Sequence, residues 1–144
     1  MTTHPTTITA HEARTIIDAA LGHGEAAGMK PLVVVVLDAG GAPVAYLRSD
    51  DSPSGRFDIA RGKANGALKL GVNSRRLGEM AVERPHFISG AAGAIEGPLV
   101  PVAGGVLVER DGVVVGAVGV SGDTSDNDEL AAIAGIVAAG LGHP

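Results

Sequence analysis

Apolar residues recur at helical spacing along two segments in the first part of the chain. Thr9 and Glu12 stand three residues apart directly before the first of them, as in a capping box. The spacing predicts helices over residues 10–27 and over residues 56–70, and Asn73 or Ser74 is a candidate cap for a short third helix that runs to residue 82. In each helix the apolar residues would form one side that packs on a core.

A fourth helix is expected near the end of the chain. Gly140 and Gly142 stand where it would end. Its apolar positions form one stripe, typical of an amphipathic helix whose apolar side packs on a core. The stripe consists of Leu130, Ile133, Ala134, Val137, Ala138 and Leu141.

Two pairs of apolar runs predict β-hairpins. Residues 31–37 are continuously apolar and residues 43–48 alternate, with turn-forming residues between them. Residues 106–110 and 113–120 flank Asp111-Gly112, a dipeptide that favours a type I′ turn. Because helices come before, between and after these hairpins, the order predicts an α/β protein of the α+β kind, with one antiparallel sheet covered by helices.

Residues 83–101 show no clear period. Pro85, Pro98 and Pro101 interrupt this segment, so we expect a long loop with a short strand near Leu99. Loops of such length in compact domains are usually functional or mobile. His86 lies in this segment beside one of the few aromatic residues, which makes it a candidate functional residue.

The chain is poor in charge for its size. Its 144 residues suit one domain, and we expect residues 1–144 to form it, with residues 1–8 as a flexible N-terminus. Charged residues make up 19%, below the typical value of about 25%, and the mean hydropathy is +0.27. This balance favours a homo-oligomer that buries part of its apolar surface. A monomer whose core is dense in alanine and glycine is the alternative.

Charge and composition exclude several classes of protein. The net charge of −5 has the wrong sign for a protein that binds nucleic acid, and three aromatic residues offer little stacking surface. The absence of cysteine excludes disulfides and thiolate metal sites. The longest apolar run, residues 32–37, is too short for a membrane helix, and residues 1–9 do not resemble a signal peptide. We therefore expect a cytoplasmic protein without membrane contact.

Polar residues at the ends of the predicted strands are the first candidates for a ligand site. Asp38 follows the first strand, and Arg48 and Asp50 follow the second. Lys63 borders the apolar side of the second predicted helix, where it either reaches water or contacts a ligand. One hypothesis is a metal-free enzyme that acts on a carboxylate substrate. Arg48 or Lys63 would bind the anion, and His86 would transfer a proton together with Asp38.

Two catalytic motifs are incomplete in this chain. The zinc motif H-E-x-x-H begins at His11 but has Thr15 at its last position. Ser121 lies in a Gly-Val-Ser-Gly run that is one residue short of a nucleophile elbow. We predict no protein-bound metal ion. Ser121 stays a candidate for ligand binding, because it leads into a predicted helix N-terminus, where free N–H groups favour anions unless capping carboxylates occupy them.

These segments resemble the GlcG/HbpS-like family of haem-binding and haem-degrading proteins. Residues 33–50 are similar to the VVDxxGxxxxxxRxD stretch of that family, and Lys63 and Ala64 stand where the family has its A..KA helix. Gly104-Gly105 and residues 111–122 resemble its GG…dGxvvGaiGvSG signature. The resemblance covers about residues 8–141.

The resemblance implies a profilin-like sandwich, with an antiparallel sheet of about five strands, flanking helices and assembly into a homo-oligomer. Some members of the family bind haem and have been linked to haem degradation or redox sensing. A related domain stands at the end of certain cobalamin adenosyltransferases.

Our leading hypothesis is therefore a tetrapyrrole-binding protein that holds haem at a subunit surface. Its iron would take His23 or His86 as an axial ligand. The expected ligand-binding residues are Arg48, Asp50, Gly105, Ser121 and His23. The metal-free enzyme that uses His86, Asp38 and Lys63 is the second hypothesis, and a structural accessory subunit is the third.

Overall fold

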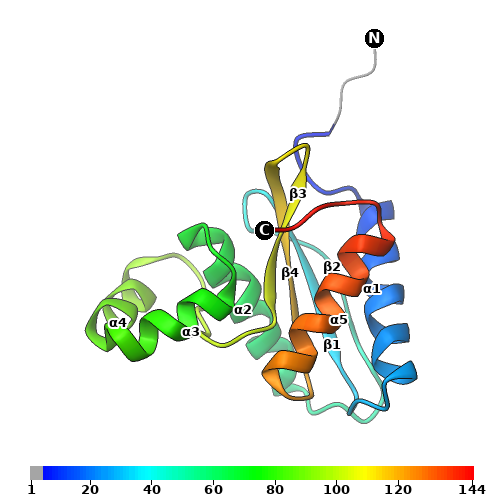
Figure 1. Cartoon of the computed structure of the whole chain (residues 1–144), viewed down its shortest axis with the longest axis horizontal. Helices are drawn as coiled ribbons and strands as arrows, with labels where there is room; N and C mark the ends of the chain where they lie inside the picture. The colour runs from blue at the N-terminus through cyan, green and yellow to red at the C-terminus, as the bar shows by residue number, and fades with distance from the viewer. Residues whose placement is uncertain (1–4) are drawn as a thin grey trace.

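The computed structural model describes residues 5–144 and is built around one antiparallel sheet (Figure 1). The strands are β1 (Val33–Asp38), β2 (Pro43–Arg48), β3 (Gly105–Arg110) and β4 (Val113–Ser121), in the order β2-β1-β4-β3. The helices are α1 (Ala10–Ala26), α2 (Gly55–Leu70), α3 (Ser74–Glu83), α4 (Pro85–Ala94) and α5 (Ser125–Ala138). The predicted α+β class is confirmed, but the sheet in the described residues has four strands and not about five. No helix in this part of the chain is both long and apolar enough to cross a membrane.

The two predicted hairpins lie side by side in the sheet. β1 pairs with β4 in antiparallel register, from Val33 opposite Ser121 to Asp38 opposite Gly116. In the turn between β3 and β4, Asp111 and its neighbouring glycine have φ values of 53° and 78°. Positive φ at both central residues is what a type I′ turn requires, so the hairpin prediction is confirmed.

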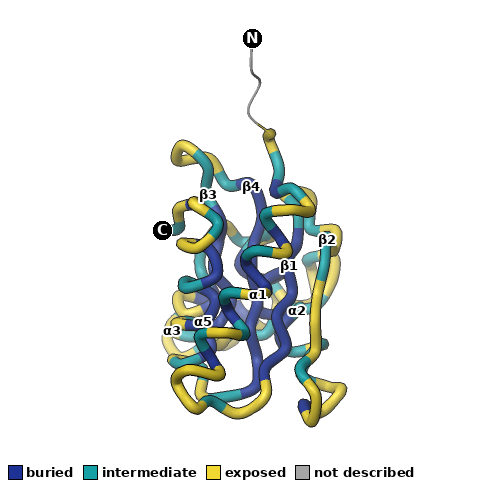
Figure 2. The backbone as a smooth tube through the Cα atoms, turned by 90° about the vertical axis from the view of Figure 1, so that its right-hand side faces the viewer, coloured by how far each residue is buried: buried dark blue, intermediate teal, exposed yellow. Residues whose placement is uncertain are grey.

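The sheet separates two layers of helices. Val34 and Val36 of β1 face the core formed with α1 and α5, whereas Val33 and Val35 face α2. This alternation follows from the two-residue period of a strand, and a strand that is covered on both faces can be apolar throughout. Figure 2 shows the result, with β1 and β4 buried along most of their length and β2 exposed at one edge.

Helix α2 packs directly on the backbone of β3 and β4. A Cβ atom at Gly119 would lie 2.0 Å from the carbonyl oxygen of Ala60, and one at Gly105 would lie 2.3 Å from that of Lys63. Real Cβ atoms do not approach backbone oxygens so closely. The two glycines therefore set the distance between α2 and the sheet.

The expected fifth strand is replaced by a segment that packs on α2. The backbone N–H of Val100 donates to the carbonyl oxygen of Gly62 at 3.1 Å. Cβ atoms at Gly62 and Gly66 would lie 2.6 and 3.0 Å from the side chains of Val100 and Leu99. The predicted short strand near Leu99 is therefore wrong, because these residues pack against the glycine side of a helix and do not pair with a strand.

A helix, α4, occupies part of the segment that was predicted to be a loop. Pro85 stands at the start of α4, where its fixed φ and missing N–H are compatible with a helix. The segment has no amphipathic period because only Ile88 of α4 is buried. Helices α3 and α4 pack on each other and form an arm that extends away from the sheet on the side of α2 (Figure 1).

The apolar stripe predicted for the last helix is buried only in part, because Ile133 packs against the core and Leu141 belongs to it, whereas other members lie on the outer face of α5. Leu130 and Val137 are 53% and 59% exposed. A Cβ atom at Gly135 would lie 2.5 Å from the carbonyl oxygen of Ile16, so α5 approaches α1 through its small residues. The buried residues of α5 are Asp128, Ala131, Ala132, Gly135 and Ile136.

A buried ion pair joins the two helix layers at one end of the sheet. The Lys63 Nζ atom of α2 lies 3.0 Å from a carboxylate oxygen of Asp128 in α5 and donates to the carbonyl oxygen of Val120 at 3.0 Å. The two side chains are 2% and 1% exposed. Burial lowers the pKa of Lys63, and the Asp128 carboxylate opposes that shift.

The N-terminal end of the described chain is tied to the β3–β4 hairpin. Ile8 is buried, and its N–H donates to the carbonyl oxygen of Val115 at 3.0 Å. Ile8 is thus attached to the hairpin at the end of the segment predicted to be flexible, and residues 1–4 of that segment lie outside the described part. Glu12 of the confirmed capping box accepts two hydrogen bonds from Arg110, at 2.7 and 2.8 Å. These bonds lower the pKa of Glu12 to about 2.

Replacing Gly119 with alanine should destabilise the fold strongly. The added Cβ would meet the Ala60 carbonyl, which the α2 backbone holds in place, so we expect a loss of about 3 kcal/mol or more in the free energy of unfolding. Urea denaturation measures this loss. Gly22→Ala in α1 is the matched control, because a Cβ there has open space, and it should raise stability slightly. Equal stabilities of the two variants would contradict the packing argument.

Removing one partner of the Lys63–Asp128 pair should cost more than neutralising both. Lys63→Met leaves a buried carboxylate unpaired, which costs about 3–5 kcal/mol. Adding Asp128→Asn should recover much of this loss, as measured by urea denaturation. Lys69→Met replaces an exposed lysine of the same helix and should leave stability nearly unchanged. A small effect of Lys63→Met, similar to that of the control, would refute the role of the pair.

The Glu12–Arg110 contact should make stability depend on pH in acid. Because the folded-state pKa of Glu12 is depressed from 4.5 to about 2, its contribution is present above pH 4.5 and is lost as the pH falls towards 2. Glu12→Gln should therefore reduce the loss of stability between about pH 6 and about pH 3 in urea denaturation. The exposed Glu79→Gln should keep the wild-type pH profile. If Glu12→Gln also kept the wild-type dependence of stability on pH, the assignment of that dependence to Glu12 would be disproved.

Candidate functional site

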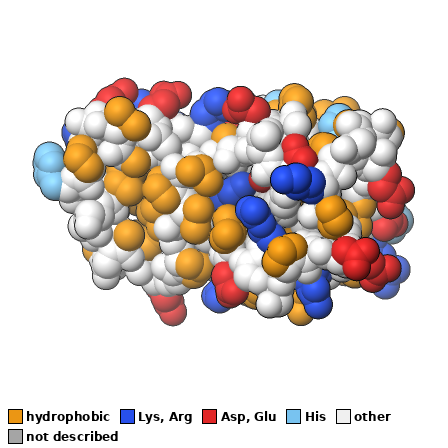
Figure 3. All heavy atoms as spheres, turned by 90° about the horizontal axis from the view of Figure 1, so that it is seen from below, with side chains coloured by type: hydrophobic (Ala, Val, Ile, Leu, Met, Phe, Trp, Pro, Cys, Tyr) orange, Lys and Arg blue, Asp and Glu red, His pale blue; other side chains and the backbone are white. Residues whose placement is uncertain are grey.

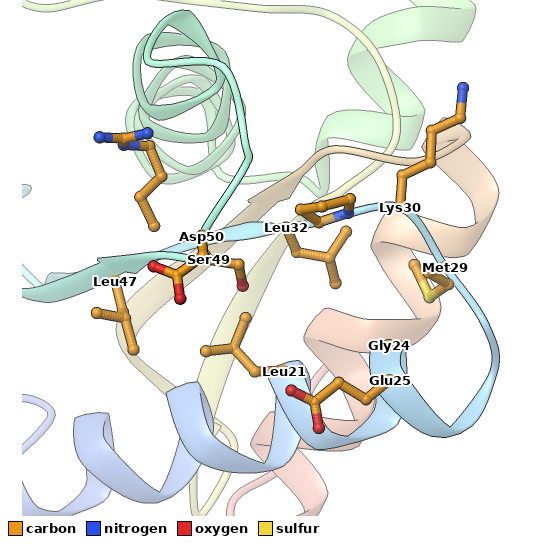
Figure 4. A pocket seen from close by; sticks show the side chains of 11 residues that line it. Leu21, Gly24, Glu25, Met29, Lys30, Leu32, Leu47, Ser49 and Asp50 are labelled. Atoms are coloured by element: carbon orange, nitrogen blue, oxygen red, sulfur yellow. The ribbon is translucent and has the colours of Figure 1, made fainter.

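A cleft of about 440 Å³ lies between the end of α1, the segment that leads into β1, and the end of β2 (Figure 4). Its volume lies within the range of small-molecule sites. It forms because the chain crosses from α1 to β1 at residues 29–32, opposite the place where β2 leaves the sheet. The cleft is lined by Leu21, Gly24, Glu25, Met29, Lys30, Pro31, Leu32, Leu47, Arg48, Ser49 and Asp50.

The walls of the cleft are apolar and its rim is charged. Leu21 of α1 lies opposite Leu32 and Leu47, as Figure 4 shows. Met29 adds a thioether to the wall. The side chain of Lys30 points outward, so its ammonium group stands at the rim. The charged groups of the lining are the carboxylates of Glu25 and Asp50 and the cations of Lys30 and Arg48.

Hydrogen bonds fix the two sides of this rim. The Arg48 Nη1 atom donates to the carbonyl oxygen of Ser52 at 2.7 Å, which leaves further guanidinium N–H groups for a ligand. The hydroxyl of Ser52 is buried and has no hydrogen-bond partner within the described residues. On the other side, the backbone N–H of Lys30 donates to Asp123 at 2.9 Å. This hydrogen bond, together with those from Asn127 and Thr124, lowers the pKa of Asp123 to about 2. The Asp123 carboxylate therefore stays charged and keeps the backbone of Lys30 in place at the cleft.

Of the residues predicted from the sequence, Arg48 and Asp50 line the cleft. Asp38 does not, because its carboxylate accepts the N–H groups of Gly40 and Ala42 within the β1–β2 turn, at 3.0 and 2.9 Å. Lys63 is buried in its ion pair, so its ammonium group is not available to an anionic ligand. Asp38 and Lys63 therefore have structural roles in this fold.

Gly105 and Ser121 are buried and lie outside the cleft. The N–H of Gly105 donates to the Ser74 hydroxyl at 2.7 Å, within the close packing of α2 and α3 on β3. The hydroxyl of Ser121 accepts a hydrogen bond from Arg56 at 3.3 Å. Both residues hold elements together, and neither faces the space that a ligand could enter.

The two predicted histidines are also apart from the cleft. His86 is exposed on α4, in the arm that packs through α3, whereas Arg48 ends β2 at the edge of the sheet (Figure 1). His23 lies in the last turn of α1 and is half-buried, but it does not line the cleft. The structure thus does not bring His86 together with Arg48, Lys63 or Asp38.

Sequence reasoning missed the apolar residues of the cleft. Leu21 had been assigned to the packed side of the first helix, and Leu47 to the alternation of the second strand. No sequence signal marked Leu47 as a site residue, because only the structure shows that it is 49% exposed at the end of an edge strand. An exposed leucine between charged residues marks an apolar surface that needs a partner.

A second cleft, of about 420 Å³, lies between α3 and α5. Its two arginines, Arg75 and Arg76, are already engaged by carboxylates of Asp126, Glu129, Glu79 and Glu83. The first cleft contains the predicted Arg48 and Asp50, and within the described residues neither Arg48 nor Lys30 forms an ion pair with another side chain. We therefore regard the first cleft as the candidate site.

Similar proteins of known sequence cover most of the chain. It is 26% identical over 140 residues to the corrinoid adenosyltransferase PduO of Salmonella typhimurium, which is 97% of this chain and 41% of that protein. The chain thus spans about two fifths of the length of that relative. It is 34% identical over 102 residues to an uncharacterized 15.0 kDa protein from the dhaT-dhaS intergenic region of Citrobacter freundii, 71% of each chain.

Solved structures of similar proteins share the fold. A PduOC:heme complex superimposes with a TM-score of 0.83 at 25% identity, over 94% of this chain and 97% of that chain. HbpS superimposes with a TM-score of 0.81 at 28% identity, over 94% and 92%. The protein ORFY of Klebsiella pneumoniae superimposes with a TM-score of 0.83 at 26% identity, over 96% and 94%.

The family model described as haem degrading protein HbpS-like matches residues 8–137. This match spans both hairpins, α1 to α4 and all but the last residue of α5. The chain therefore belongs to the HbpS-like family, as its sequence motifs indicated.

Proposed function

We propose that this protein binds a tetrapyrrole, haem in the first instance, in the cleft between α1 and β2. The main observation behind this proposal is that one cleft combines apolar walls with two cations at its rim, Lys30 and Arg48. Membership of the HbpS-like family and the similarity to a PduOC:heme complex support the choice of haem over other flat apolar ligands. The proposal concerns binding, and it assigns no haem-degrading reaction to this chain.

The residues of the cleft fit the chemistry of haem. Leu21, Leu32 and Leu47 would contact the apolar macrocycle, and Lys30 and Arg48 would pair with its carboxylates. Met29 supplies a thioether, which is a known axial donor to haem iron. Among the described residues no histidine lines the cleft, so the expected role of His23 or His86 as an iron ligand has no support here. When bound, haem would supply iron redox chemistry, and the protein would control its orientation and exposure to water.

The other two hypotheses have less support. The metal-free enzyme required His86 near a bound anion, and His86 lies on the separate arm. A purely structural subunit would not need a cleft of this size with apolar walls and charged groups at its rim. Self-association into a homo-oligomer remains part of the proposal, supported by the low fraction of charged residues in the chain.

A haem titration followed in the Soret band tests the binding proposal. The wild-type protein should shift the band and saturate at one haem per chain. Leu47→Asp places a charge in the apolar wall and should weaken binding about tenfold or more. Leu130→Asp is the matched control, because Leu130 is about as exposed but lies on α5, and it should bind like the wild type. Met29→Ala should change the position of the Soret band if the thioether contacts iron.

Two results would overturn this assignment. A titration without any Soret shift in the wild type removes haem as the ligand. Equal binding by Leu47→Asp and the wild type places haem elsewhere on the protein.

A further inference from the structure

One wall of the cleft is a segment that belongs to no helix or strand. Residues 29–32 connect α1 to β1 and line the cleft. At one end of this segment Met29 donates its N–H to a carbonyl oxygen of α1 at 2.9 Å, and at the other end Leu32 accepts the N–H of Ser49 at 2.9 Å. Of the two residues between these anchors, Pro31 has no N–H group. The middle of the wall therefore has one backbone N–H group by which it can be held.

That N–H group belongs to Lys30 and is held from outside the segment by Asp123. It donates to the Asp123 carboxylate at 2.9 Å, across 93 positions in the sequence. The neighbouring Gly122 lies against the same segment, because a Cβ atom there would stand 2.3 Å from the carbonyl oxygen of Pro31. The turn between β4 and α5 therefore contacts the backbone of the wall with two successive residues.

Asp123 is itself fixed in position by α5. Its N–H donates to a carboxylate oxygen of Asp128 at 2.9 Å, and its second carboxylate oxygen accepts the side-chain amide of Asn127 at 2.8 Å. Asp128 in turn is buried and paired with Lys63. The acceptor for the Lys30 N–H is thus in place before any ligand arrives, as a preorganised site requires.

The cap of α5 does not account for this arrangement. The hydroxyl of Thr124 accepts the N–H of Asn127 at 3.2 Å and thereby caps the helix. The negative charge of Asp123 is favourable near a helix N-terminus in any orientation. By accepting the N–H of a distant segment, the Asp123 carboxylate does something that neither the cap nor the helix dipole requires.

We propose that Asp123 is the positioning residue of the cleft, which holds the backbone of Lys30 and thereby fixes the Lys30 and Met29 side chains relative to a bound ligand. This proposal rests on the proposed function and adds a residue that does not itself line the cleft. Figure 4 shows the two side chains that depend on it, the thioether at the wall and the ammonium group at the rim. Without the hydrogen bond a ligand would have to order the wall on binding, and that ordering lowers affinity.

The charge of Asp123 is a second way in which this residue could affect a ligand. Figure 3 views the molecule from the end where α5 begins, and it shows acidic and basic side chains close together on the half away from the α3–α4 arm. Loss of any carboxylate here changes the field at an anionic ligand within about 10 Å at 0.1 M salt. Two variants separate the charge from the hydrogen bond. Asp123→Asn loses the charge and keeps an acceptor for the Lys30 N–H, whereas Asp126→Ala removes an exposed carboxylate from the same end of α5.

Amide hydrogen exchange of the ligand-free protein measures the positioning directly. In Asp123→Ala the Lys30 amide should exchange about tenfold faster than in the wild type, because it has lost its acceptor. In Asp123→Asn its rate should stay within about threefold of the wild type, because the side-chain oxygen still accepts. The Ile8 amide, which donates to Val115 of β4, is the internal control and should be unchanged in both variants.

A haem titration in the Soret band measures the consequence for binding. Asp123→Ala should raise the dissociation constant about tenfold, because the wall has lost its order. Asp123→Asn should bind within about threefold of the wild type. Asp126→Ala should bind like the wild type, although it also loses one negative charge. Urea denaturation first establishes that each variant is folded.

Each contrary result overturns the proposal. An unchanged exchange rate of the Lys30 amide in Asp123→Ala shows that other contacts hold the wall. If Asp123→Asn or Asp126→Ala weakens haem binding as much as Asp123→Ala does, the effect comes from charge. Faster exchange with unchanged haem affinity shows that the wall position does not matter to the site. The exchange measurement contains no haem, so a wild type without a Soret shift rejects the proposed function, while exchange at Lys30 still decides whether Asp123 positions the wall.

Discussion

The close approach of α2 to the sheet is the constraint on which the rest of the structure depends. Gly105 and Gly119 allow the helix backbone to lie almost against the strands. At that distance the side chain of Lys63 passes the glycine-rich start of β3 and reaches Asp128 on the other side of the sheet. Two helix layers that have separate hydrophobic cores are thereby joined by a buried ion pair.

The same ion pair is connected to the wall of the cleft. One carboxylate oxygen of Asp128 accepts a hydrogen bond from the Lys63 ammonium group at 3.0 Å. The other oxygen accepts a hydrogen bond from the backbone N–H of Asp123 at 2.9 Å. Asp123 in turn accepts the N–H of Lys30, which lines the cleft. In the sequence Lys63 borders an apolar helix face, where it would reach water or contact a ligand. In the structure it is buried and, through Asp128 and Asp123, is connected to the segment that lines the cleft.

The sequence was informative wherever one local signal determined the structure. The Asp111-Gly112 turn and the Thr9–Glu12 cap have short-range signatures, and both were predicted correctly. The site could not be predicted in the same way, because Leu21 and Leu47 come together only when β2 lies at the edge beside α1. The α4 helix was missed because its apolar residues are not arranged on one side around a core of the same chain.

Glycine has two different roles in this protein. This explains why some features of the fold could be predicted from the sequence and others could not. At Gly105, Gly119 and Gly135 an added Cβ would collide with a backbone oxygen, so the reason for glycine lies inside the fold. At Gly90 and Gly93 an added Cβ would meet open space, so the reason is not found within one chain. Composition alone cannot separate these cases, and this is why a glycine-rich core and a homo-oligomer looked like alternatives. In the structure the two are compatible, because the interior glycines bring the helices onto the sheet, whereas the glycines of α4 lie on the outside and take no part in that packing.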